Sequence, residues 1–467
     1  MSERNSAFDE AVQFVLGFAN YEKKPPNSYN ETTYSLEGFR HLLNELGNPH
    51  QYGRIIHIAG TKGKGATAAI LDSILNTCGF RTGLFTSPHL VDIRERIRVN
   101  GYAISESRFT QLANEVRSVL PGGTQGGFRT TFEILTAMAF LEFRQQNVDF
   151  SILEVGMGGR LDCTNVVDPI LTAINPISLD HTESLGRTIR RIAEEKAGIL
   201  KPHRSCVVAR QSSQALEVIR KRALELNARL IAVPRILSVR SISMDGSCFD
   251  LKADSERIGP VTLRLPGRFQ IENAAMAIGL FKSLADELNW GLDSETVIEG
   301  CLRARWPGRL MPIETSGWYP ADEPPVLLAD GAHNPLAIRR VSESLGDIFP
   351  GARFTTIIAA PANKDYNGMI REITLRTGDM IVTRYAGSRA LPVRELKATA
   401  DRYHTSVHEA DGLSDALRLA SRLNPLAPVL VTGSLYLIGE LCEMAGLRER
   451  CLNLRIENTE DPCIHGM

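Results

Sequence analysis

A glycine- and lysine-rich turn directly after an apolar run limits what this chain can fold into more than any other feature. Residues 55–59 read Ile-Ile-His-Ile-Ala, and residues 60–66 read Gly-Thr-Lys-Gly-Lys-Gly-Ala. The apolar run predicts a buried strand, the glycines predict a tight turn, and residues 67–78 predict a helix. In that arrangement the backbone N–H groups of the turn and the helix dipole together bind an anion. We therefore expect a phosphate-binding loop whose ligand is a nucleoside triphosphate, with Lys64 reaching its outer oxygens.

The loop does not follow the usual phosphate-loop pattern, G-x-x-x-x-G-K-[ST]. Its spacing is shorter, Gly65 follows Lys64, and Ala66 stands where a hydroxyl residue is expected. Glycine and lysine also occur together in plain turns after strands. The loop alone therefore leaves a plain turn and a phosphate site both open, and the rest of the chain has to decide between them.

Length and composition restrict the class of protein. A chain of 467 residues exceeds one ordinary hydrophobic core and predicts two or three domains. Its 43% hydrophobic and 23% charged residues are typical of a soluble globular protein, and its net charge of −1 argues against a nucleic-acid or membrane partner. No apolar run is long enough to cross a membrane, and residues 1–5 are too polar for a signal peptide. The eight scattered cysteines include no C-x-x-C pair, which predicts reduced thiols in a cytoplasmic protein rather than disulfides or a zinc site.

Alternating strand and helix patterns predict an α/β protein with two domains. We expect a large, doubly wound N-terminal domain over residues 1–304, which carries the phosphate loop and a β-rich insert near 235–265. Residues 305–312 read Arg-Trp-Pro-Gly-Arg-Leu-Met-Pro and are expected to form a hinge. Residues 313–456 predict a smaller, Rossmann-like α/β domain, and the polar residues 457–467 are expected to form a disordered tail.

Polar side chains follow several of the predicted strands. Ser87 and Glu154 each lie at the end of a strand, and His181 lies just past the end of another. Open α/β sheets bind ligands at the carboxyl ends of their strands, where a carboxylate is well placed to hold Mg²⁺. A lone histidine is more often structural than a ligand, so for His181 both interpretations stay open.

A charged run occupies residues 92–98, which read Asp-Ile-Arg-Glu-Arg-Ile-Arg. Most runs of this kind form a solvent-exposed face, and that is the interpretation we favour here. The alternative is that the three arginines, lying beside a phosphate loop, attract an acidic substrate.

Several short motifs now resemble one family when they are taken in order and spacing. They are residues 60–65 (Gly-Thr-Lys-Gly-Lys-Gly), 86–89 (Thr-Ser-Pro-His), 154–162 (Glu-Val-Gly-Met-Gly-Gly-Arg-Leu-Asp), 179–182 (Leu-Asp-His-Thr), 195–199 (Glu-Lys-Ala-Gly-Ile), 307–309 (Pro-Gly-Arg) and 330–335 (Asp-Gly-Ala-His-Asn-Pro). Together they resemble the bifunctional dihydrofolate synthase/folylpolyglutamate synthase family, within the Mur ligase superfamily. The resemblance runs from about Tyr34 to Glu440, and the blocks 154–165 and 330–335 are its most specific parts.

The resemblance implies an ATP-dependent amide-bond ligase with Mg²⁺ as its metal. Such an enzyme joins L-glutamate to dihydropteroate, or to the γ-carboxylate of a (tetrahydro)folate, through an acyl phosphate. It also implies a monomer that acts on small molecules.

Three other interpretations remain. A Mur-type ligase on a cell-wall nucleotide precursor would need a uridine-nucleotide domain before the loop at residue 60. A non-catalytic nucleotide-binding homologue is favoured by Ala66 alone, and a nucleic-acid-binding NTPase lacks a basic excess.

The resemblance also assigns residues to the nucleotide and the metal. The implied ATP-binding residues are Lys62, Gly63, Lys64, Gly65, Asn273, Arg309 and Asp330. The implied Mg²⁺ ligands are Ser87, Glu154 and His181, and the implied catalytic residues are Lys64, Lys196, His333 and Ser434. Lys196 resembles a lysine that the family carries as a carbamate (N6-carboxylysine), although the chemistry of the sequence alone favours an ordinary helix lysine. His333 and Ser434 match positions linked to glutamate and the acyl phosphate.

The pterin or folate is expected on a third set of residues. These are Thr130, Thr131, Phe132, Glu133, Asp162, Cys163 and Thr164, with Phe132 available for ring stacking. Thr130 and Glu133 also have the spacing of a capping box at the start of a helix.

Three residues depart from the family pattern. Ala66 replaces a serine or threonine, and the adjacent Thr67 is the hydroxyl that can substitute for it. Cys163 stands where the family often has alanine, a small change in volume that we expect to be tolerated. Lys62 replaces the commoner asparagine, which we interpret as a minor change.

Overall fold

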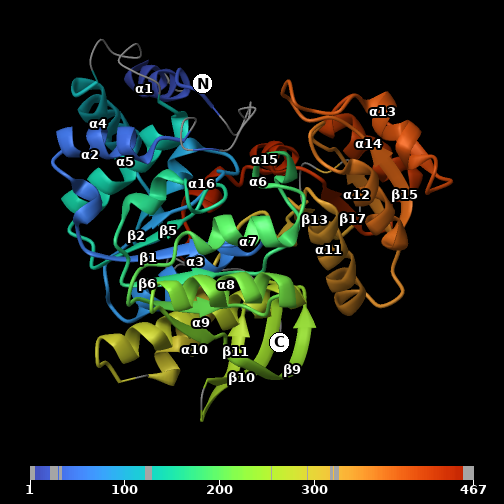
Figure 1. The fold of residues 1–467 in the computed structure, drawn as a ribbon. Helices are drawn as coiled ribbons and strands as arrows, with labels where there is room; N and C mark the ends of the chain where they lie inside the picture. The colour runs from blue at the N-terminus through green and yellow to red at the C-terminus, as the bar shows by residue number, and fades with distance from the viewer. Residues whose placement is uncertain are drawn as a thin grey trace.

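Two mainly parallel sheets, one in each half of the chain, organise the molecule (Figure 1). The structure is a computed structural model that describes residues 6–20, 30, 34–120, 129–253, 255–291, 293–315, 319 and 325–455. The predicted α/β class, with a large first domain and a separate second one, is confirmed. The predicted tail at 457–467 lies outside the described residues. In the described part of the chain, no helix is long and apolar enough to cross a membrane.

The first sheet has eight strands in the order β4-β3-β2-β5-β1-β6-β7-β8. Strands β2, β5, β1, β6, β7 and β8 are parallel, and β3 and β4 add an antiparallel edge. The bounds are β1 Arg54–Ala59, β2 Thr82–Phe85, β3 Ile97–Val99, β4 Tyr102–Ala103, β5 Phe150–Glu154, β6 Leu171–Ile174, β7 Ser205–Val208 and β8 Arg229–Ala232. Because β1, β2, β5 and β6 run in the same direction, the residues that follow them meet at one edge of the sheet.

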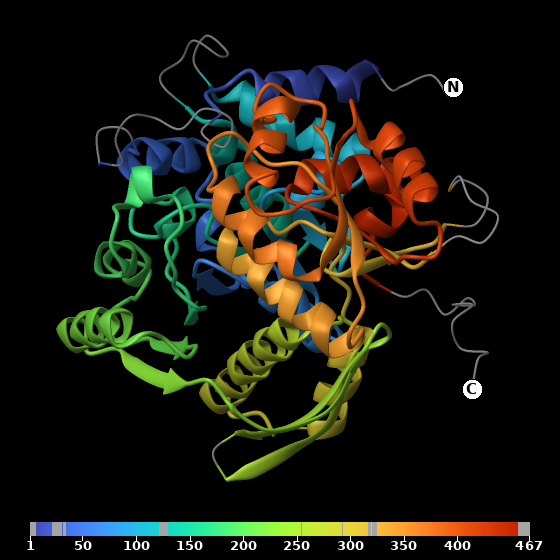
Figure 2. The same cartoon turned by 90° about the vertical axis from the view of Figure 1, so that its right-hand side faces the viewer.

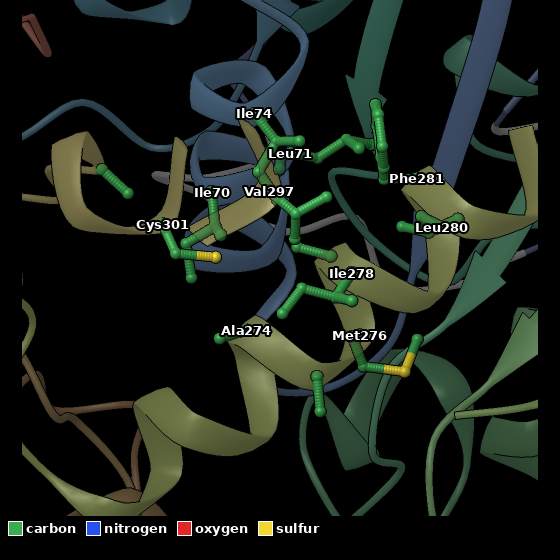
Figure 3. Packing of buried hydrophobic residues seen from close by; sticks show 14 of the residues in the cluster. Ile70, Leu71, Ile74, Ala274, Met276, Ile278, Leu280, Phe281, Val297 and Cys301 are labelled. Atoms are coloured by element: carbon green, nitrogen blue, oxygen red, sulfur yellow. The ribbon is translucent and has the colours of Figure 1, made fainter. Parts of the chain in front are cut away.

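Helices cover both faces of this sheet, as the predicted doubly wound fold requires. On one face lie α3 Lys64–Thr77, α9 Arg268–Glu287 and α10 Ser294–Arg303; Figure 3 shows Ile70, Leu71 and Ile74 of α3 packed against Ile278 of α9 and Val297 of α10. The other face is covered by α1 Ser6–Leu16, α2 Leu36–Glu45, α4 Glu106–Ser118, α5 Thr131–Gln145, α7 Ile189–Ala197 and α8 Ser213–Glu225, with the short α6 Thr182–Leu185 at its end. The central strand β1 is thus enclosed from both sides.

A separate three-stranded antiparallel sheet follows β8. It contains β9 Arg235–Ser243, β10 Gly246–Ala253 and β11 Glu256–Leu263 in the order β11-β10-β9. In Figure 2 these strands lie at the foot of the molecule, near the end of α11. Met244, at the β9–β10 turn, packs against a hydrophobic cluster of the second domain, so this sheet touches both halves of the chain.

The second sheet has six strands in the order β12-β13-β17-β14-β15-β16, parallel except for β12. Its strands are β12 Met311–Ile313, β13 Leu327–Asp330, β14 Phe354–Ile358, β15 Thr377–Val382, β16 Val407–Glu409 and β17 Val429–Thr432. Its helices are α11 Pro335–Ile348, α12 Tyr366–Ile373, α13 Val393–Ala400, α14 Leu413–Leu423 and α15 Leu435–Met444. The chain enters this sheet between the end of α10 and the start of β12. That residues 305–312 act as a hinge stays a prediction.

The last described residues return to the first domain. Helix α16 Arg448–Leu452 is followed by Leu454, which packs into the core of the first domain and donates its N–H to the Gly101 carbonyl at 2.9 Å. Asn453 forms a β-bridge with Tyr102. We call residues 448–455 the C-terminal strap, because they join the second domain back onto the first.

The strap explains why the favoured interpretation of the charged run at residues 92–98 is wrong. Asp92, Glu95, Arg96 and Arg98 are all at most 5% exposed, although the sequence favours a solvated face. Arg98 Nη2 donates to the Cys451 carbonyl at 2.7 Å, and Arg448 of the strap pairs with Asp92 at 2.5 Å. Glu95 accepts hydrogen bonds from three backbone N–H groups, those of residues 90–92. The run is therefore a buried anchor for the strap.

Candidate active site

One cavity of about 490 Å³ lies between the two domains, at the carboxyl ends of the strands of the first sheet. Its wall includes all the predicted site residues except Thr164 and Lys196. The first domain contributes Lys62, Gly63, Lys64, Gly65, Ser87, Thr130, Thr131, Phe132, Glu133, Glu154, Asp162, Cys163, His181 and Asn273, and the remainder of the chain contributes Arg309, Asp330, His333 and Ser434. Residues that are far apart in the sequence are thus brought to one place.

The predicted anion-binding turn ends at the first turn of α3. Gly63 is the N-cap of this helix with a φ of 82°, and no described side chain caps the helix at that end. A Cβ atom on Gly63 would lie 2.1 Å from Oδ1 of Asn273, so this position requires glycine for two independent reasons. The N–H groups of the first helical turn are consequently open toward the cavity, which is the arrangement that binds phosphate. Helix α3 begins at Lys64, three residues before the predicted start.

Trp306 lies against the same turn, although the sequence interpretation placed it only in the expected hinge and not in the site. A Cβ atom on Gly65 would meet Cζ2 of Trp306 at 2.6 Å and Oε2 of Glu154 at 3.2 Å. Trp306 comes from the segment between the two domains and lines the cavity. The close approach explains why the residue after Lys64 is a glycine, which has no Cβ atom to collide with Trp306.

Glu154 and Ser87 lie together beside Lys64, as the prediction of a metal site requires. Oε2 of Glu154 accepts a hydrogen bond from the Ser87 N–H at 3.0 Å, and its Oε1 lies 3.6 Å from Nζ of Lys64. Burial raises the pKa of Glu154, and Lys64 and the Ser87 N–H offset part of that rise. A buried carboxylate next to a hydroxyl is a donor set that Mg²⁺ accepts when phosphate and water complete its shell. No group of three or more His, Cys, Asp or Glu side chains able to hold a metal occurs in the described part of the chain, so the fit depends on this small set.

The missing hydroxyl at Ala66 is not replaced by Thr67. Ala66 lines the cavity, whereas Thr67 is fully buried behind it. The Thr67 hydroxyl accepts a hydrogen bond from Asn175 Nδ2 at 2.8 Å and lies 3.5 Å from the Asn273 carbonyl. The expectation that Thr67 substitutes is therefore wrong, because successive residues on a helix point in directions about 100° apart.

Lys196 lies behind the loop rather than in the cavity wall. Its side chain is 5% exposed, and its Nζ donates to the Gly60 carbonyl at 2.9 Å. Burial, together with the charge of Lys64, lowers the pKa of Lys196 to about 7. A lysine with this pKa carries a substantial fraction of neutral amine near neutral pH, and only the neutral amine reacts with CO₂.

Asp180 connects the two domains, and the sequence interpretation gave it no role. Its Oδ2 accepts hydrogen bonds from Lys62 Nζ at 2.8 Å and from Asn334 Nδ2 at 3.1 Å, and its Oδ1 accepts one from Lys364 Nζ at 3.0 Å. Lys62 belongs to the loop of the first domain, whereas Asn334 and Lys364 belong to the second. Burial alone would raise the pKa of Asp180, but Lys62, His181 and Lys364 hold it well below its usual range. The replacement of the family's commoner asparagine by Lys62 is therefore not a minor change, because Lys62 pairs with the carboxylate that links the two domains.

Removing the charge of Asp180 is expected to destabilise the closed arrangement of the domains. Asp180→Asn leaves two lysines facing each other without a carboxylate, which costs about 2 kcal/mol and lowers the thermal unfolding midpoint by about 4 to 8 °C. Because the pKa of Asp180 is depressed, its contribution is fully present above about pH 4 and is lost as the pH falls through the lowered pKa. Differential scanning calorimetry at pH 7 and at lower pH measures both effects.

A matched control is Asp347→Asn, which breaks another ion pair across the same interface. Arg268 Nε lies 3.1 Å from Asp347 Oδ2, but the two side chains are 57% and 31% exposed. Exposed pairs contribute at most about 1 kcal/mol, so the midpoint is expected to move by only about 2 °C. Equal shifts for Asp347→Asn and Asp180→Asn would contradict the assignment of a special role to Asp180.

The predicted pterin side of the cavity is built on the start of α5. Thr130 Oγ1 accepts from the Glu133 N–H at 3.1 Å and Glu133 Oε2 accepts from the Thr130 N–H at 2.7 Å, which confirms the predicted capping box. Phe132 is half-buried and lies 5.6 Å from the ring of Phe85. Thr164 is fully buried and contributes nothing to the cavity wall. Its hydroxyl donates to Asp162 Oδ1 at 2.5 Å, so Thr164 holds Asp162 in place.

The second domain contributes a group of polar residues opposite the loop. Both oxygens of Asp330 accept backbone N–H groups, from Leu310 and Ala332, each at 2.8 Å. His333 Nδ1 lies 2.9 Å from the Gly331 carbonyl. Burial, with Lys62 and Lys364 nearby, holds the pKa of His333 well below its usual range. His333 is therefore a neutral imidazole in the cavity wall.

Further cavity residues escaped the sequence interpretation. They include Asp180, Lys364, Arg389, Trp306 and Tyr436 in the wall and Asn334 beside it. Asp180 and Asn334 lie inside motifs that the sequence analysis recognised. Lys364 follows strand β14, so its position after a strand end was the signal that could have identified it. Arg389 and Tyr436 follow strands β15 and β17 in the same way, so this signal was available for them too.

Comparisons with known proteins point in one direction. Two family models match the chain, the Mur ligase middle domain over residues 58–281 and the Mur ligase, glutamate ligase domain over residues 314–435. The dihydrofolate synthase/folylpolyglutamate synthase of Bacillus subtilis (strain 168) is 33% identical over 442 residues, which are 93% of this chain and 98% of that protein.

Solved structures agree with these matches over nearly the whole chain. The Mycobacterium tuberculosis folylpolyglutamate synthase (FPGS) complexed with ADP and AMPPCP has a TM-score of 0.83 at 28% identity, over 94% of this chain and 98% of that one. An FPGS–AMPPCP–folate complex has a TM-score of 0.80 at 29% identity, over 93% of this chain and 98% of that one.

Proposed function

The chain belongs to the dihydrofolate synthase/folylpolyglutamate synthase family of Mur ligases, and from this premise we propose that it adds L-glutamate to a pteroate or folate carboxylate at the expense of ATP. The acceptor is dihydropteroate, the γ-carboxylate of a (tetrahydro)folate, or both. The bond forms through an acyl phosphate, since a carboxylate by itself is a poor acyl donor at neutral pH.

The observation that carries this proposal is the cavity that both domains line. Its floor is an open helix N-terminus with Lys64, and its opposite wall carries His333 and Ser434 from the second domain. A ligase of this kind must bring a nucleotide, an acid and an amine to one point. A cavity lined by residues of two domains can meet that requirement. A protein that only binds a nucleotide would not need residues of a second domain in its site.

The first chemical step is transfer of the γ-phosphoryl group to the acceptor carboxylate. A carboxylate oxygen attacks phosphorus, and ADP leaves. The N–H groups at the start of α3 and the ammonium of Lys64 face the phosphates and stabilise the charge that develops on their oxygens. Asn273, Arg309 and Asp330 hold the nucleotide from the far side. We propose that Ser87, Glu154 and His181 would hold a Mg²⁺ ion, which would supply positive charge to offset the negative charge that develops during phosphoryl transfer.

In the second step the glutamate amine attacks the acyl carbon, and inorganic phosphate leaves. The amine must lose a proton, and we propose that His333 accepts it. A carbonyl oxygen only accepts hydrogen bonds, so Nδ1 of His333 donates to the Gly331 carbonyl and Nε2 carries the lone pair. Its lowered pKa keeps Nε2 unprotonated before the reaction. Ser434, the N-cap of α15, is proposed to orient the acyl phosphate or glutamate beside it.

Lys196 is proposed to carry a carbamate. Its neutral amine attacks the carbon of CO₂ and releases one proton to solvent, so the side chain becomes an anionic carbamate directly behind the phosphate loop. The lowered pKa and the position beside Gly60 support this proposal. The resulting carboxylate would orient the ligands near the metal.

The pterin or folate is proposed to bind along the start of α5. Thr130, Thr131, Phe132 and Glu133 line that side, with Phe132 presenting its ring to the cavity. Asp162 and Cys163 line the adjoining wall, and Thr164 acts through its hydrogen bond to Asp162 rather than by contact. We further propose a cytoplasmic monomer that acts on small molecules. The seven described cysteines are all free thiols, which supports a reducing compartment.

The test is a turnover assay with the purified protein, ATP, Mg²⁺ and L-glutamate. ADP release is measured with dihydropteroate in one series and with a tetrahydrofolate in another. We expect glutamate-dependent ADP release with at least one acceptor, and mass spectrometry then identifies the product with one added glutamate. Absence of ADP release with both acceptors would overturn the proposed function.

A further inference from the structure

Arg389 and Tyr436 form a preorganised pair in the cavity wall of the second domain. Arg389 Nη2 donates to the Tyr436 hydroxyl at 2.6 Å, and its guanidinium lies over the Tyr436 ring at 5.3 Å. The Tyr436 ring in turn stacks on Tyr385, with centroids 5.4 Å apart and an interplanar angle of 21°. Tyr385 is only 3% exposed, so the stack rests on the core of the domain. An aromatic platform of this kind fixes the plane of a guanidinium.

The loop that carries Arg389 is fastened to the loop that carries Lys364. The Ala362 N–H donates to the Arg389 carbonyl at 2.9 Å, and the Leu391 N–H donates to the Ala360 carbonyl at 2.9 Å. A β-bridge joins Pro361 to Ala390 between these two bonds. Both loops follow parallel strands of the second sheet, β14 and β15. The backbone around Arg389 is therefore held in register with the wall that faces the phosphate loop.

The second domain contributes more cationic than anionic side chains to the cavity, although Lys364 pairs with Asp180 and Arg340 with Glu272, each at 3.0 Å. The second domain contributes Lys364 and Arg389 as well as Arg340 to the cavity, and Asp330 is the only carboxylate it contributes among the described residues. Both oxygens of Asp330 are already bonded to backbone N–H groups. A small anionic substrate is the natural occupant of such a wall.

We propose that Arg389, held by Tyr436, binds the side-chain carboxylate of the incoming L-glutamate and thereby selects glutamate as the amine. This assignment rests on the proposed function. The glutamate amine and its α-carboxylate share one carbon, so both must lie close to the reacting acyl carbon near His333. The side-chain carboxylate is separated from that carbon by two methylene groups. It therefore reaches outward along the wall, where Tyr436 follows Ser434 by two residues on the first turn of α15.

The guanidinium of Arg389 explains how glutamate is distinguished from glutamine. The two amino acids have the same shape, but only glutamate offers two anionic oxygens to the fork of an arginine. A site built around a charged hydrogen-bond donor rejects an isostere that cannot complete the pair. Arg389 is thus a specificity residue for the amine substrate.

The test compares Arg389→Gln with the wild-type enzyme in the same ADP-release assay. We expect the KM for L-glutamate to rise roughly 10- to 100-fold, as for the loss of a charge-assisted hydrogen bond, with both acceptors alike. The KM for ATP is expected to stay within about twofold, since the phosphate loop is untouched, and the preference for L-glutamate over L-glutamine is expected to fall by a similar factor of roughly 10 to 100. Tyr436→Phe, which removes only the hydroxyl, is expected to give the same pattern with a smaller rise in the KM for L-glutamate, roughly 3- to 10-fold.

Arg384→Gln is the matched control. Arg384 precedes the same loop and donates through Nε to the Asp411 carbonyl at 3.0 Å, outside the cavity wall. Its kinetics are expected to equal those of the wild type. Should Arg389→Gln fail to fold, Tyr436→Phe decides alone: an unchanged KM for L-glutamate overturns the assignment.

Two further results would overturn the assignment while leaving the proposed function intact. One is an Arg389→Gln enzyme whose KM for L-glutamate equals that of the wild type. The other is a raised KM for a glutamylated folate acceptor with an unchanged KM for L-glutamate, which would place the acceptor's carboxylate on Arg389 instead. A wild-type enzyme that releases no ADP with either acceptor is different, because it overturns the proposed function and the assignment together.

Discussion

Glu154→Gln is expected to lower kcat by about two to three orders of magnitude. The amide keeps the shape of the side chain and still accepts the Ser87 N–H, which lies 3.0 Å from Oε2 in the wild type. It removes the negative charge that faces Lys64 at 3.6 Å and that a divalent cation requires. The loss should therefore appear in kcat and in the Mg²⁺ concentration needed for half-maximal rate, which a titration with MgCl₂ under saturating substrates measures.

Glu372→Gln controls for the loss of a buried, paired carboxylate elsewhere. Glu372 is 8% exposed and pairs with Arg339 at 2.8 Å, but it does not line the cavity. This variant is expected to keep wild-type turnover even if its melting temperature falls. Wild-type rates for Glu154→Gln would refute the metal assignment of Glu154.

Removing CO₂ is expected to lower turnover about tenfold or more, and bicarbonate is expected to restore it, if Lys196 carries a carbamate. The pKa of Lys196 is lowered to about 7, so the reactive neutral amine predominates above that pH and disappears below it. Dependence on added bicarbonate should therefore be steepest below about pH 7, where the neutral amine is scarce. ¹³C NMR after incubation with labelled bicarbonate detects the carbamate directly.

Lysine-to-arginine variants test for the carbamate while keeping the positive charge of the side chain. Lys196→Arg keeps a cation but cannot form the carbamate, and its activity should be low and insensitive to bicarbonate. Lys201→Arg is the control, because Lys201 also has a lowered pKa and donates to a carbonyl, that of Asn165 at 3.0 Å, outside the cavity wall. A wild-type enzyme without a bicarbonate response and without a labelled carbamate signal would contradict the proposal.

The phosphate loop and the ends of its neighbouring strands were predictable because their signals are local. An apolar run before closely spaced glycines predicts a strand and a turn from neighbouring residues alone. Parallel strands then bring Ser87 and Glu154 to one edge without any knowledge of long-range contacts. For the same reason the prediction failed at Thr67, where the outcome depends on which side of α3 faces the cavity.

The links between the domains were not predictable from local patterns. Asp180 and Lys364 are 184 positions apart, and neither residue carries a sign of its partner. The charged run at residues 92–98 has the same composition whether it is solvated or buried. Its burial depends on the return of the C-terminal strap from far along the chain; Arg98 and Cys451, for example, are 353 positions apart.

The C-terminal strap also limits how the two domains can move. The chain passes from the first domain to the second once, between Arg303 and Met311, and the strap fastens it to the first domain a second time at Asn453 and Leu454. A body held at two separate points keeps one free rotation, about the line that joins those points. Opening of the cavity is therefore expected to be a rotation of the second domain about this one axis. Each such rotation would separate Lys364 and Asn334 from Asp180 along the same path.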